Sequence, residues 1–346
     1  MATVPVTIEE LKRQTGSEYS GGSVHAQIDE VATRRTKDQK TYLEILLRDG
    51  TASFPLRVWS DHPSRGFCSE LRNGDFVEVQ GDFIVTPAFG LEARNWNVRF
   101  LTAAEKDELL TGPPEVRKKQ SVDYSAIESF IASVRDPRLR ELSLLFLREF
   151  EDRLRRAAGA RRYHHARRGG LVEHIAQMMR ACDALAAIYT ALNRDLLLTG
   201  ILFHDSGKLW ENCFPKESFI MPHDFRAELV GHVSMGVELV NRLWHRLKEG
   251  AEFSSWNVLS PDSDLVRLHL LHLVASHHGE KQFGSPVEPK TPEAMTLHLI
   301  DNLDAKLEMM SSNYQLGKRL GPEVIERIRP LPANLVAALP AFSEEA

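Results

Sequence analysis

The sequence has 346 residues, of which 42% are apolar and 26% are charged, and its net charge at pH 7 is −5. This length is typical of two domains or one large one, and the composition is that of a globular protein. The negative net charge excludes a basic surface that covers the whole chain, so any nucleic-acid-binding surface would have to be local.

The cysteine pattern and the hydropathy predict where the protein resides. Cys68, Cys182 and Cys213 have no CxxC spacing and are expected to be reduced thiols. No apolar run reaches the roughly 18 residues that span a bilayer. Residues 1–14 carry charges without an apolar core, which predicts that no signal peptide is present. We therefore expect a soluble, cytoplasmic protein that has no membrane partner.

Residues 20–103 have the pattern of a small antiparallel barrel. Apolar side chains alternate on both sides of Asp49-Gly50, a dipeptide typical of hairpin turns. Five or so short strands in this order resemble an OB-fold of the nucleic-acid-binding type, whose sequence signature is weak. The expected strands cover residues 42–48, 54–58, 76–79, 83–85, 91–94 and 96–101.

Some aromatic residues of this barrel are candidates for stacking on the bases of a single strand. Most of them are expected to lie in the core, because alternation buries every second side chain. Trp59 and Phe89 lie near predicted loops and are the better candidates for substrate binding.

The second part of the chain is predicted to be helical. Residues 105–122 form the expected linker, because Thr111-Gly-Pro-Pro114 breaks regular structure. From residue 123 onward, apolar positions recur every three or four residues. The fold class is therefore a small all-β OB-type barrel at 1–104 followed by an all-α bundle at 123–346. The expected helices cover residues 137–158, 171–190, 194–206, 225–248, 263–277 and 292–313.

Histidine and aspartate residues beside apolar helical runs are the main chemical signal of this part. The pair His204-Asp205 ends one such run, and the pair His277-His278 ends another. Adjacent helical residues point about 100° apart, so Asp205 must reach around an ion or bridge two ions. Each of these residues alone is more often structural, but the ordered series is a strong signal. The candidate metal ligands are His174, His204, Asp205, His232, His277, His278 and Asp301.

This ordered series resembles the signature of the HD phosphohydrolase superfamily. The resemblance is closest to the YhaM-type 3′–5′ exoribonucleases, which join an N-terminal OB-fold to a C-terminal HD domain. Motifs match over roughly residues 160–310, and the barrel matches by architecture only. Two departures are Ser206, where the family usually has an apolar residue, and a long stretch at 210–226. The matching segments are Tyr163–His165, Gly169–His174, Asn193–Leu198, His204–Lys208, Gly231-His232, Ser276–Gly279, Pro289–Ala294, Leu297-His298 and Asp301–Lys306.

The candidate ligands exceed the needs of one ion. Two ions about 4 Å apart suit phosphodiester hydrolysis. Nitrogen and oxygen ligands without thiolate favour Mn²⁺, Fe²⁺, Co²⁺ or Mg²⁺, and the resemblance implies Mn²⁺. A site for one ion, made by His174, His204, Asp205 and Asp301 alone, stays open. The two groups, which share Asp205 as a bridge, are His174, His204, Asp205 and Asp301 for one ion, and Asp205, His232, His277 and His278 for the other.

Several cations near these ligands are candidates for contacts with the substrate. Asp205 and Lys208 are the predicted catalytic residues, because Lys208 follows the ligands by one turn and could neutralise a phosphate oxygen. A basic loop before His174 could guide a polyanion, although most such runs are solvated helix ends. The predicted substrate-binding cations are Arg161, Arg162, Arg167, Arg168 and Lys290.

These features together favour a metal-dependent 3′–5′ exonuclease. The resemblance implies hydrolysis of single-stranded RNA, or also DNA, to nucleoside monophosphates, with the barrel holding the strand. An HD-type hydrolase of small or cyclic nucleotides is a second interpretation. A non-catalytic single-strand-binding protein is a third, and the complete ligand set argues against it. Family members of this type can assemble, so the sequence leaves a homo-oligomer open.

Overall fold

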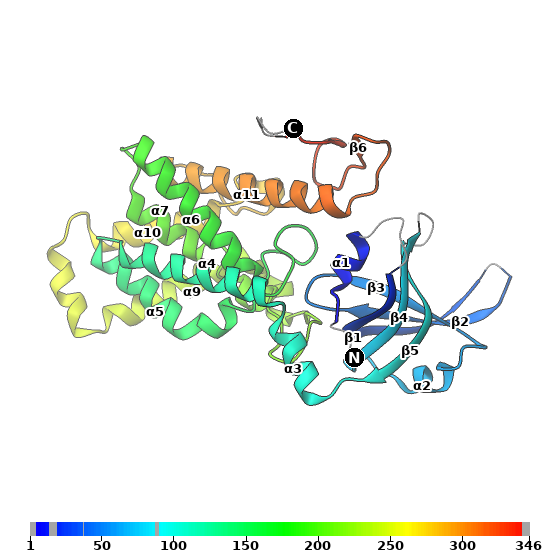
Figure 1. The fold of residues 1–346 in the computed structure, drawn as a ribbon. Helices are drawn as coiled ribbons and strands as arrows, with labels where there is room; N and C mark the ends of the chain where they lie inside the picture. Colours follow the sequence, from blue (N-terminus) through cyan, green and yellow to red (C-terminus); the bar gives the residue numbers. More distant parts are fainter. Residues whose placement is uncertain (1–4, 14–18, 37, 87–89, 341–346) are drawn as a thin grey trace.

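The computed structural model describes residues 5–13, 19–36, 38–86 and 90–340. A β barrel and a larger helical region lie beside each other (Figure 1). This arrangement confirms the predicted fold class, an OB-like five-stranded antiparallel sheet followed by a helical region.

The barrel is one antiparallel sheet with the strand order β3-β2-β1-β4-β5. Its alternating positions are buried as the pattern predicts, so that Leu43, Ile45 and Leu47 of β2 lie inside. Two short helices, α1 (Ile8–Arg13) and α2 (Arg65–Glu70), accompany the sheet. The strands are β1 (Tyr19–Arg35), β2 (Thr41–Arg48), β3 (Ser53–Trp59), β4 (Phe76–Thr86) and β5 (Gly90–Phe100).

Long, bent strands rather than short ones close the barrel. β1 has 17 residues and pairs with β4 through its first half and with β2 through its second. The β4–β5 register shifts between Gln80 and Asp82. A Cβ on Gly81 at that shift would lie 2.6 Å from Cβ of Trp96, so only glycine allows the two strands to approach this closely.

The helical region begins at Ala103, just before the segment that was expected to be a linker. Residues 105–122 belong to α3 (Ala103–Thr111) and to α4 (Pro114–Ala132), and Gly112 with a φ of +81° separates them. None of the helices in the described part of the chain is both long and apolar enough to cross a membrane. The other helices are α5 (Pro137–Leu154), α6 (Gly170–Ile188), α7 (Arg194–Phe203), α8 (Lys208–Glu211), α9 (Phe225–Lys248), η1 (Ala251–Val258), α10 (Ser263–Ser276), η2 (Lys281–Phe283) and α11 (Pro292–Leu316).

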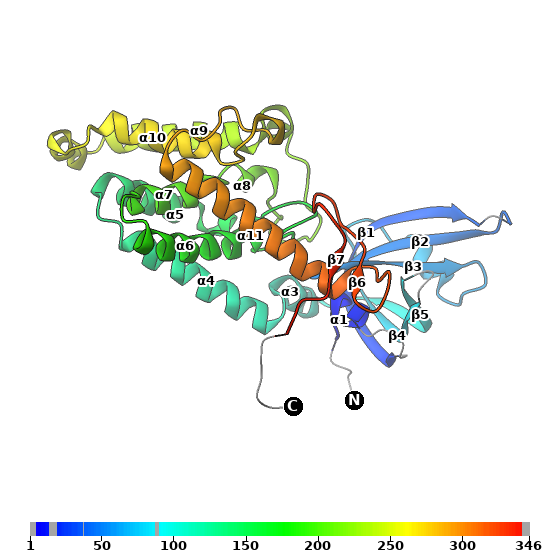
Figure 2. The same ribbon diagram turned by 90° about the horizontal axis from the view of Figure 1, so that it is seen from above.

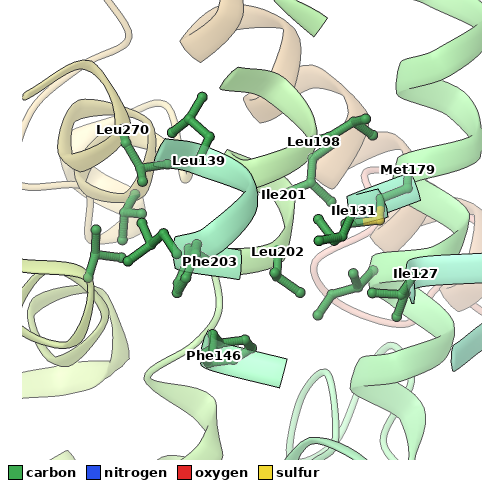
Figure 3. Close-up of a cluster of buried hydrophobic side chains, with 14 of the residues drawn as sticks. Ile127, Ile131, Leu139, Phe146, Met179, Leu198, Ile201, Leu202, Phe203 and Leu270 are labelled. Atoms are coloured by element: carbon green, nitrogen blue, oxygen red, sulfur yellow. The ribbon is translucent and has the colours of Figure 1, made fainter. Parts of the chain in front are cut away.

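Helix α7 lies in the centre of the helical core. Every residue from Leu196 to Phe203 is buried, and Figure 3 shows Leu198, Ile201 and Phe203 among side chains of the surrounding helices. Fully burying one such side chain contributes about 1.5–3 kcal/mol. Because α7 is buried up to its last residue, Phe203, the two residues that follow it, His204 and Asp205, lie deep inside the protein.

The end of α11 is covered by a small hairpin. Strands β6 (Val324–Ile325) and β7 (Leu335–Val336) pair there, and Ile325 and Leu335 pack against Met309. Figure 2 shows α11 running from the helical region toward this hairpin, close to α1 of the barrel.

The long stretch at 210–226 joins the two parts. Gln27 of β1, only 2% exposed, accepts hydrogen bonds from Ser218 Oγ (3.0 Å) and from the Phe219 amide (2.7 Å). The Phe219 side chain is buried beside Gly50. The departure from the family pattern at 210–226 therefore forms one of the contacts between the helical region and the barrel.

Candidate metal centre

All seven predicted ligands meet at one place. They come from α6, the ends of α7 and α10, α9 and α11, which lie next to one another in the helical region. The structure brings their donor atoms together in two adjacent groups. These are His174, His204 and Asp301, and Asp205, His232, His277 and His278.

Asp205 lies between the two groups and turns one carboxylate oxygen toward each. Its Oδ2 lies 3.2 Å from His204 Nε2 and 3.9 Å from His174 Nε2. Its Oδ1 lies 3.6 Å from Nε2 of both His232 and His277. This is the position that a carboxylate bridging two cations would occupy.

Every one of the five histidines presents the same ring nitrogen to the centre. Each Nδ1 faces a carbonyl or carboxylate oxygen, which can only accept, so Nδ1 carries the proton and Nε2 is left as a lone-pair donor. Such anchoring is typical of metal-ligating histidines. The anchors are Asp304 Oδ2 for His174 (2.6 Å), the Ile201 carbonyl for His204 (2.7 Å), Glu211 Oε2 for His232 (2.9 Å), the Val274 carbonyl for His277 (2.7 Å) and the Phe283 carbonyl for His278 (2.7 Å).

The donor atoms have too few partners within the protein. Asp205 Oδ1 and His277 Nε2 are buried without a hydrogen-bond partner among the described residues. Two pairs of Nε2 atoms, His174 with His204 and His232 with His278, lie only 3.3 Å apart. Buried polar atoms normally find partners, and with Nδ1 protonated in both rings the Nε2 lone pairs of His232 and His278 face and repel each other. A cation among these atoms would remove both costs, so the residues fit a metal ion.

The electrostatics of the two groups differ. Burial alone would lower the pKa of His174, but hydrogen bonds to Asp301 and Asp304 reverse this effect and raise it to about 9. Burial, with neighbouring His277 and His232, lowers the pKa of His278 to about 3, so this imidazole is neutral at pH 7. A metal that binds His174 must displace its proton, because ligating imidazole is neutral.

Lys208 contacts the bridging carboxylate directly. Its Nζ donates a hydrogen bond to Asp205 Oδ2 at 2.6 Å, and the side chain is buried. Burial would raise the pKa of Asp205, but Lys208 and then His204 outweigh it and hold that pKa well below its usual range. The predicted catalytic pair is therefore adjacent in space.

The predicted arginines of the loop at 161–168 differ in their contacts. Arg161 donates to the carbonyls of Glu211 and Pro222, and Arg168 donates to the carbonyls of Pro215 and Lys216. Arg167 pairs with Glu173 and Glu308. Arg162 is exposed and has no hydrogen-bond or ion-pair partner within the described ranges.

The other substrate-binding candidates are not among the groups of side chains that could hold an ion. Lys290 lies two residues before α11, and its backbone amide donates to His272 Nε2 at 2.9 Å. Trp59 is 42% exposed at the end of β3, with its ring 5.0 Å from that of Tyr42. Phe89 lies outside the described residues.

Some residues around the centre could not be found from their sequence pattern. Glu211 anchors His232 and carries no motif beyond its place one turn after Lys208. The His164 ring centroid lies 5.9 Å from that of His174. Burial, then Lys208 and His174, lowers the pKa of His164 to about 3. The pair His164-His165 next to the Gly-Gly break was the one available signal.

Close backbone packing places His232. A Cβ on Gly207 would lie 2.0 Å from the His232 carbonyl oxygen, so only glycine permits this approach. Gly231, with a φ of +71°, interrupts α9 just before His232. These two glycines bring the middle of α9 against the turn that carries Asp205.

Two comparisons with known proteins found similarities. Residues 171–306, which include all seven candidate ligands, match the HD domain family. The solution structure of a replication factor A related protein from Methanobacterium thermoautotrophicum matches 28% of this chain and 91% of its own, with 19% identity and a TM-score of 0.22. The chain thus contains an HD domain at residues 171–306, which supports its place in the HD superfamily of metal-dependent phosphohydrolases.

Proposed function

We propose that the protein is a 3′–5′ exonuclease of the YhaM type. It shortens single-stranded RNA, or also single-stranded DNA, by hydrolysing the terminal phosphodiester bond and releasing nucleoside monophosphates. In this proposal residues 1–104 bind the strand, 105–122 link the two parts, and 123–346 hold the catalytic domain.

The orientation of the five histidines supports this proposal most strongly. The Nε2 atoms of His174, His204, His232 and His277 lie within 3.9 Å of an oxygen of Asp205, which suits two cations with a shared carboxylate. His174, His204, Asp205 and Asp301 would hold one ion, and Asp205, His232, His277 and His278 the other. Bound Mn²⁺, or Mg²⁺, Co²⁺ or Fe²⁺, supplies Lewis acidity and charge neutralisation for phosphodiester hydrolysis.

The surrounding residues have defined tasks in this scheme. Asp304 and Glu211 keep the rings of His174 and His232 in the ligating tautomer. Lys208 offsets the buried charge of Asp205 and lies where it can act on a phosphate oxygen. Among the arginines of the loop, Arg162 has its charge available for a substrate, whereas Arg161, Arg167 and Arg168 have their guanidinium groups bound to the protein.

A length ladder tests the proposal. A 5′-labelled single strand is incubated with the enzyme and Mn²⁺, Mg²⁺ or Co²⁺, as RNA and as DNA. We expect stepwise shortening of a strand with a free 3′ end and no shortening when that end carries a phosphate. Hydrolysis of mononucleotides or cyclic nucleotides alone would instead support the small-nucleotide hydrolase, and strand binding without any hydrolysis would support the non-catalytic interpretation.

A further inference from the structure

A large cleft lies between the barrel and the helical region. Its volume is about 1630 Å³. The barrel contributes α1 and the turn between β2 and β3, while the helical region contributes α3, the start of α4 and the loop at 161–168. Neither Trp59 nor Lys290 lines it.

The walls of this cleft are strongly basic. Thirteen lysine and arginine side chains line it against six aspartate and glutamate side chains. The chain as a whole has a net charge of −5, so the cleft concentrates positive charge that the rest of the molecule lacks. A concave, positively charged surface attracts a polyanion.

Not every cation of the cleft is available to a ligand. Arg161, Arg167 and Arg168 have protein partners, as described above. Lys12 of α1, Arg117 of α4 and Arg162 have no hydrogen-bond or ion-pair partner in the described part of the chain. These three cations, called the spare cations below, belong to three different walls of the cleft, and Arg117 and Arg162 are exposed.

The size and the position of the cleft indicate the class of ligand. Small-molecule sites have volumes of roughly 300–1,000 Å³, so this cleft exceeds what a mononucleotide needs. The loop at 161–168 borders both the cleft and the metal centre. Tyr163, 47% exposed, and His165 line the cleft, and His165 shares the carboxylate of Asp304 with His174.

We propose that this cleft binds the sugar-phosphate backbone of a single-stranded nucleic acid through the spare cations Lys12, Arg117 and Arg162. This inference rests on the proposed function, because it describes how a strand lies while its end reaches the metal centre. It also assigns the strand to the side of the barrel that carries α1 and the β2–β3 turn, away from Trp59.

Two neighbouring residues of α4 provide a matched test. Arg117 lines the cleft, whereas Lys118 does not, and both are exposed. Binding of a labelled oligouridylate of about 16 nucleotides, blocked by a 3′-phosphate, is measured by fluorescence anisotropy over a range of NaCl concentrations. We expect Arg117→Glu and Arg162→Glu each to weaken binding about tenfold near 0.1 M salt and to flatten the log–log salt slope by about 0.7 or more, since each removes a phosphate contact. Lys118→Glu should leave both quantities unchanged.

A small substrate tests the metal centre independently of the cleft. Hydrolysis of bis(p-nitrophenyl) phosphate with added Mn²⁺ needs the metal centre and no strand, so we expect equal rates for Arg117→Glu and Lys118→Glu. Equal strand binding by Arg117→Glu and Lys118→Glu would overturn the proposal that the cleft binds the strand, even if both variants still hydrolyse the small diester. If the unchanged protein hydrolyses neither the strand nor bis(p-nitrophenyl) phosphate, weaker strand binding by Arg117→Glu than by Lys118→Glu would support strand binding in the cleft and overturn the proposed exonuclease.

Discussion

Lys208 donates a hydrogen bond of 2.6 Å to the same oxygen of Asp205 that faces His204 and His174. A buried carboxylate is costly unless its charge is compensated. Lys208 supplies part of that compensation, while the other carboxylate oxygen has no hydrogen-bond partner among the described residues. In the proposed two-ion arrangement, both ion positions therefore depend on Asp205.

Replacing Asp205 with alanine should abolish hydrolysis and spare strand binding. The substitution removes a side chain that faces both groups of candidate ligands, so we expect kcat to fall by a factor of at least about 10³. Single-turnover shortening of a labelled strand measures the loss, and anisotropy measures the binding. Substantial turnover with Mn²⁺ present would contradict the two-ion arrangement.

Replacing Asp304 with alanine should weaken metal binding without removing a ligand. Asp304 holds His174 through Nδ1 at 2.6 Å, and loss of such an anchor typically costs 10- to 100-fold in metal affinity or activity. Isothermal titration with Mn²⁺ measures the affinity. Asn302→Ala on the same helix is the control, and an equal effect of both substitutions would count against the anchoring role.

Replacing Glu173 with glutamine should destabilise the fold. Glu173 is 2% exposed and is held by Arg167 and Lys119. Removing one partner from a buried ion pair costs about 3–5 kcal/mol, so we expect a loss of roughly 3 kcal/mol in the free energy of unfolding at pH 7. Urea denaturation followed by circular dichroism measures it.

The Glu173 carboxylate should also make the free energy of unfolding fall in acid. Burial raises the pKa of Glu173, but Arg167 and then Lys119 outweigh it and lower the value from 4.5 to about 2. A lowered carboxylate pKa stabilises the fold fully above the unfolded value, and this contribution disappears as the pH falls from about 4.5 to 2. The difference between wild type and Glu173→Gln should therefore shrink over that range, and a constant difference would refute the assignment.

Replacing Gln27 with alanine should impair the handling of long strands only. The substitution leaves the Ser218 hydroxyl and the Phe219 amide without their acceptor, at a cost of about 1–3 kcal/mol for a buried group. We expect slower shortening of long strands and an unchanged rate on bis(p-nitrophenyl) phosphate. A parallel loss on both substrates would show that the contact supports the metal centre itself.

The structure brings together the seven candidate ligands that the sequence predicted, because each lies beside an apolar run whose burial follows from its periodicity. Helix α7 is an example, since burying Leu196 to Phe203 leaves His204 and Asp205 no place but the interior. The barrel was predicted less completely, because the polar, glycine-containing start of β1 does not show that 17 residues form one strand.

The contacts of the anchoring groups could not be predicted. Three of the five histidine anchors are main-chain carbonyls of Ile201, Val274 and Phe283, which have no side-chain signal. The arginine-rich loop shows the same limit. Composition gives the number of positive charges, but only the structure shows that Arg161 and Arg168 hold the carbonyls of the segment at 211–222.

The hydrogen bonds of Gln27 to Ser218 and Phe219 tie the barrel to the helical region that carries the metal centre. In the proposed exonuclease, a strand in the cleft would keep its contacts with α1 only while it is long enough to reach from α1 to the metal centre. A strand shortened below that length would lose those contacts and bind more weakly. We therefore expect digestion to leave, besides mononucleotides, a residual oligomer of characteristic length that is set by the spacing of the two parts.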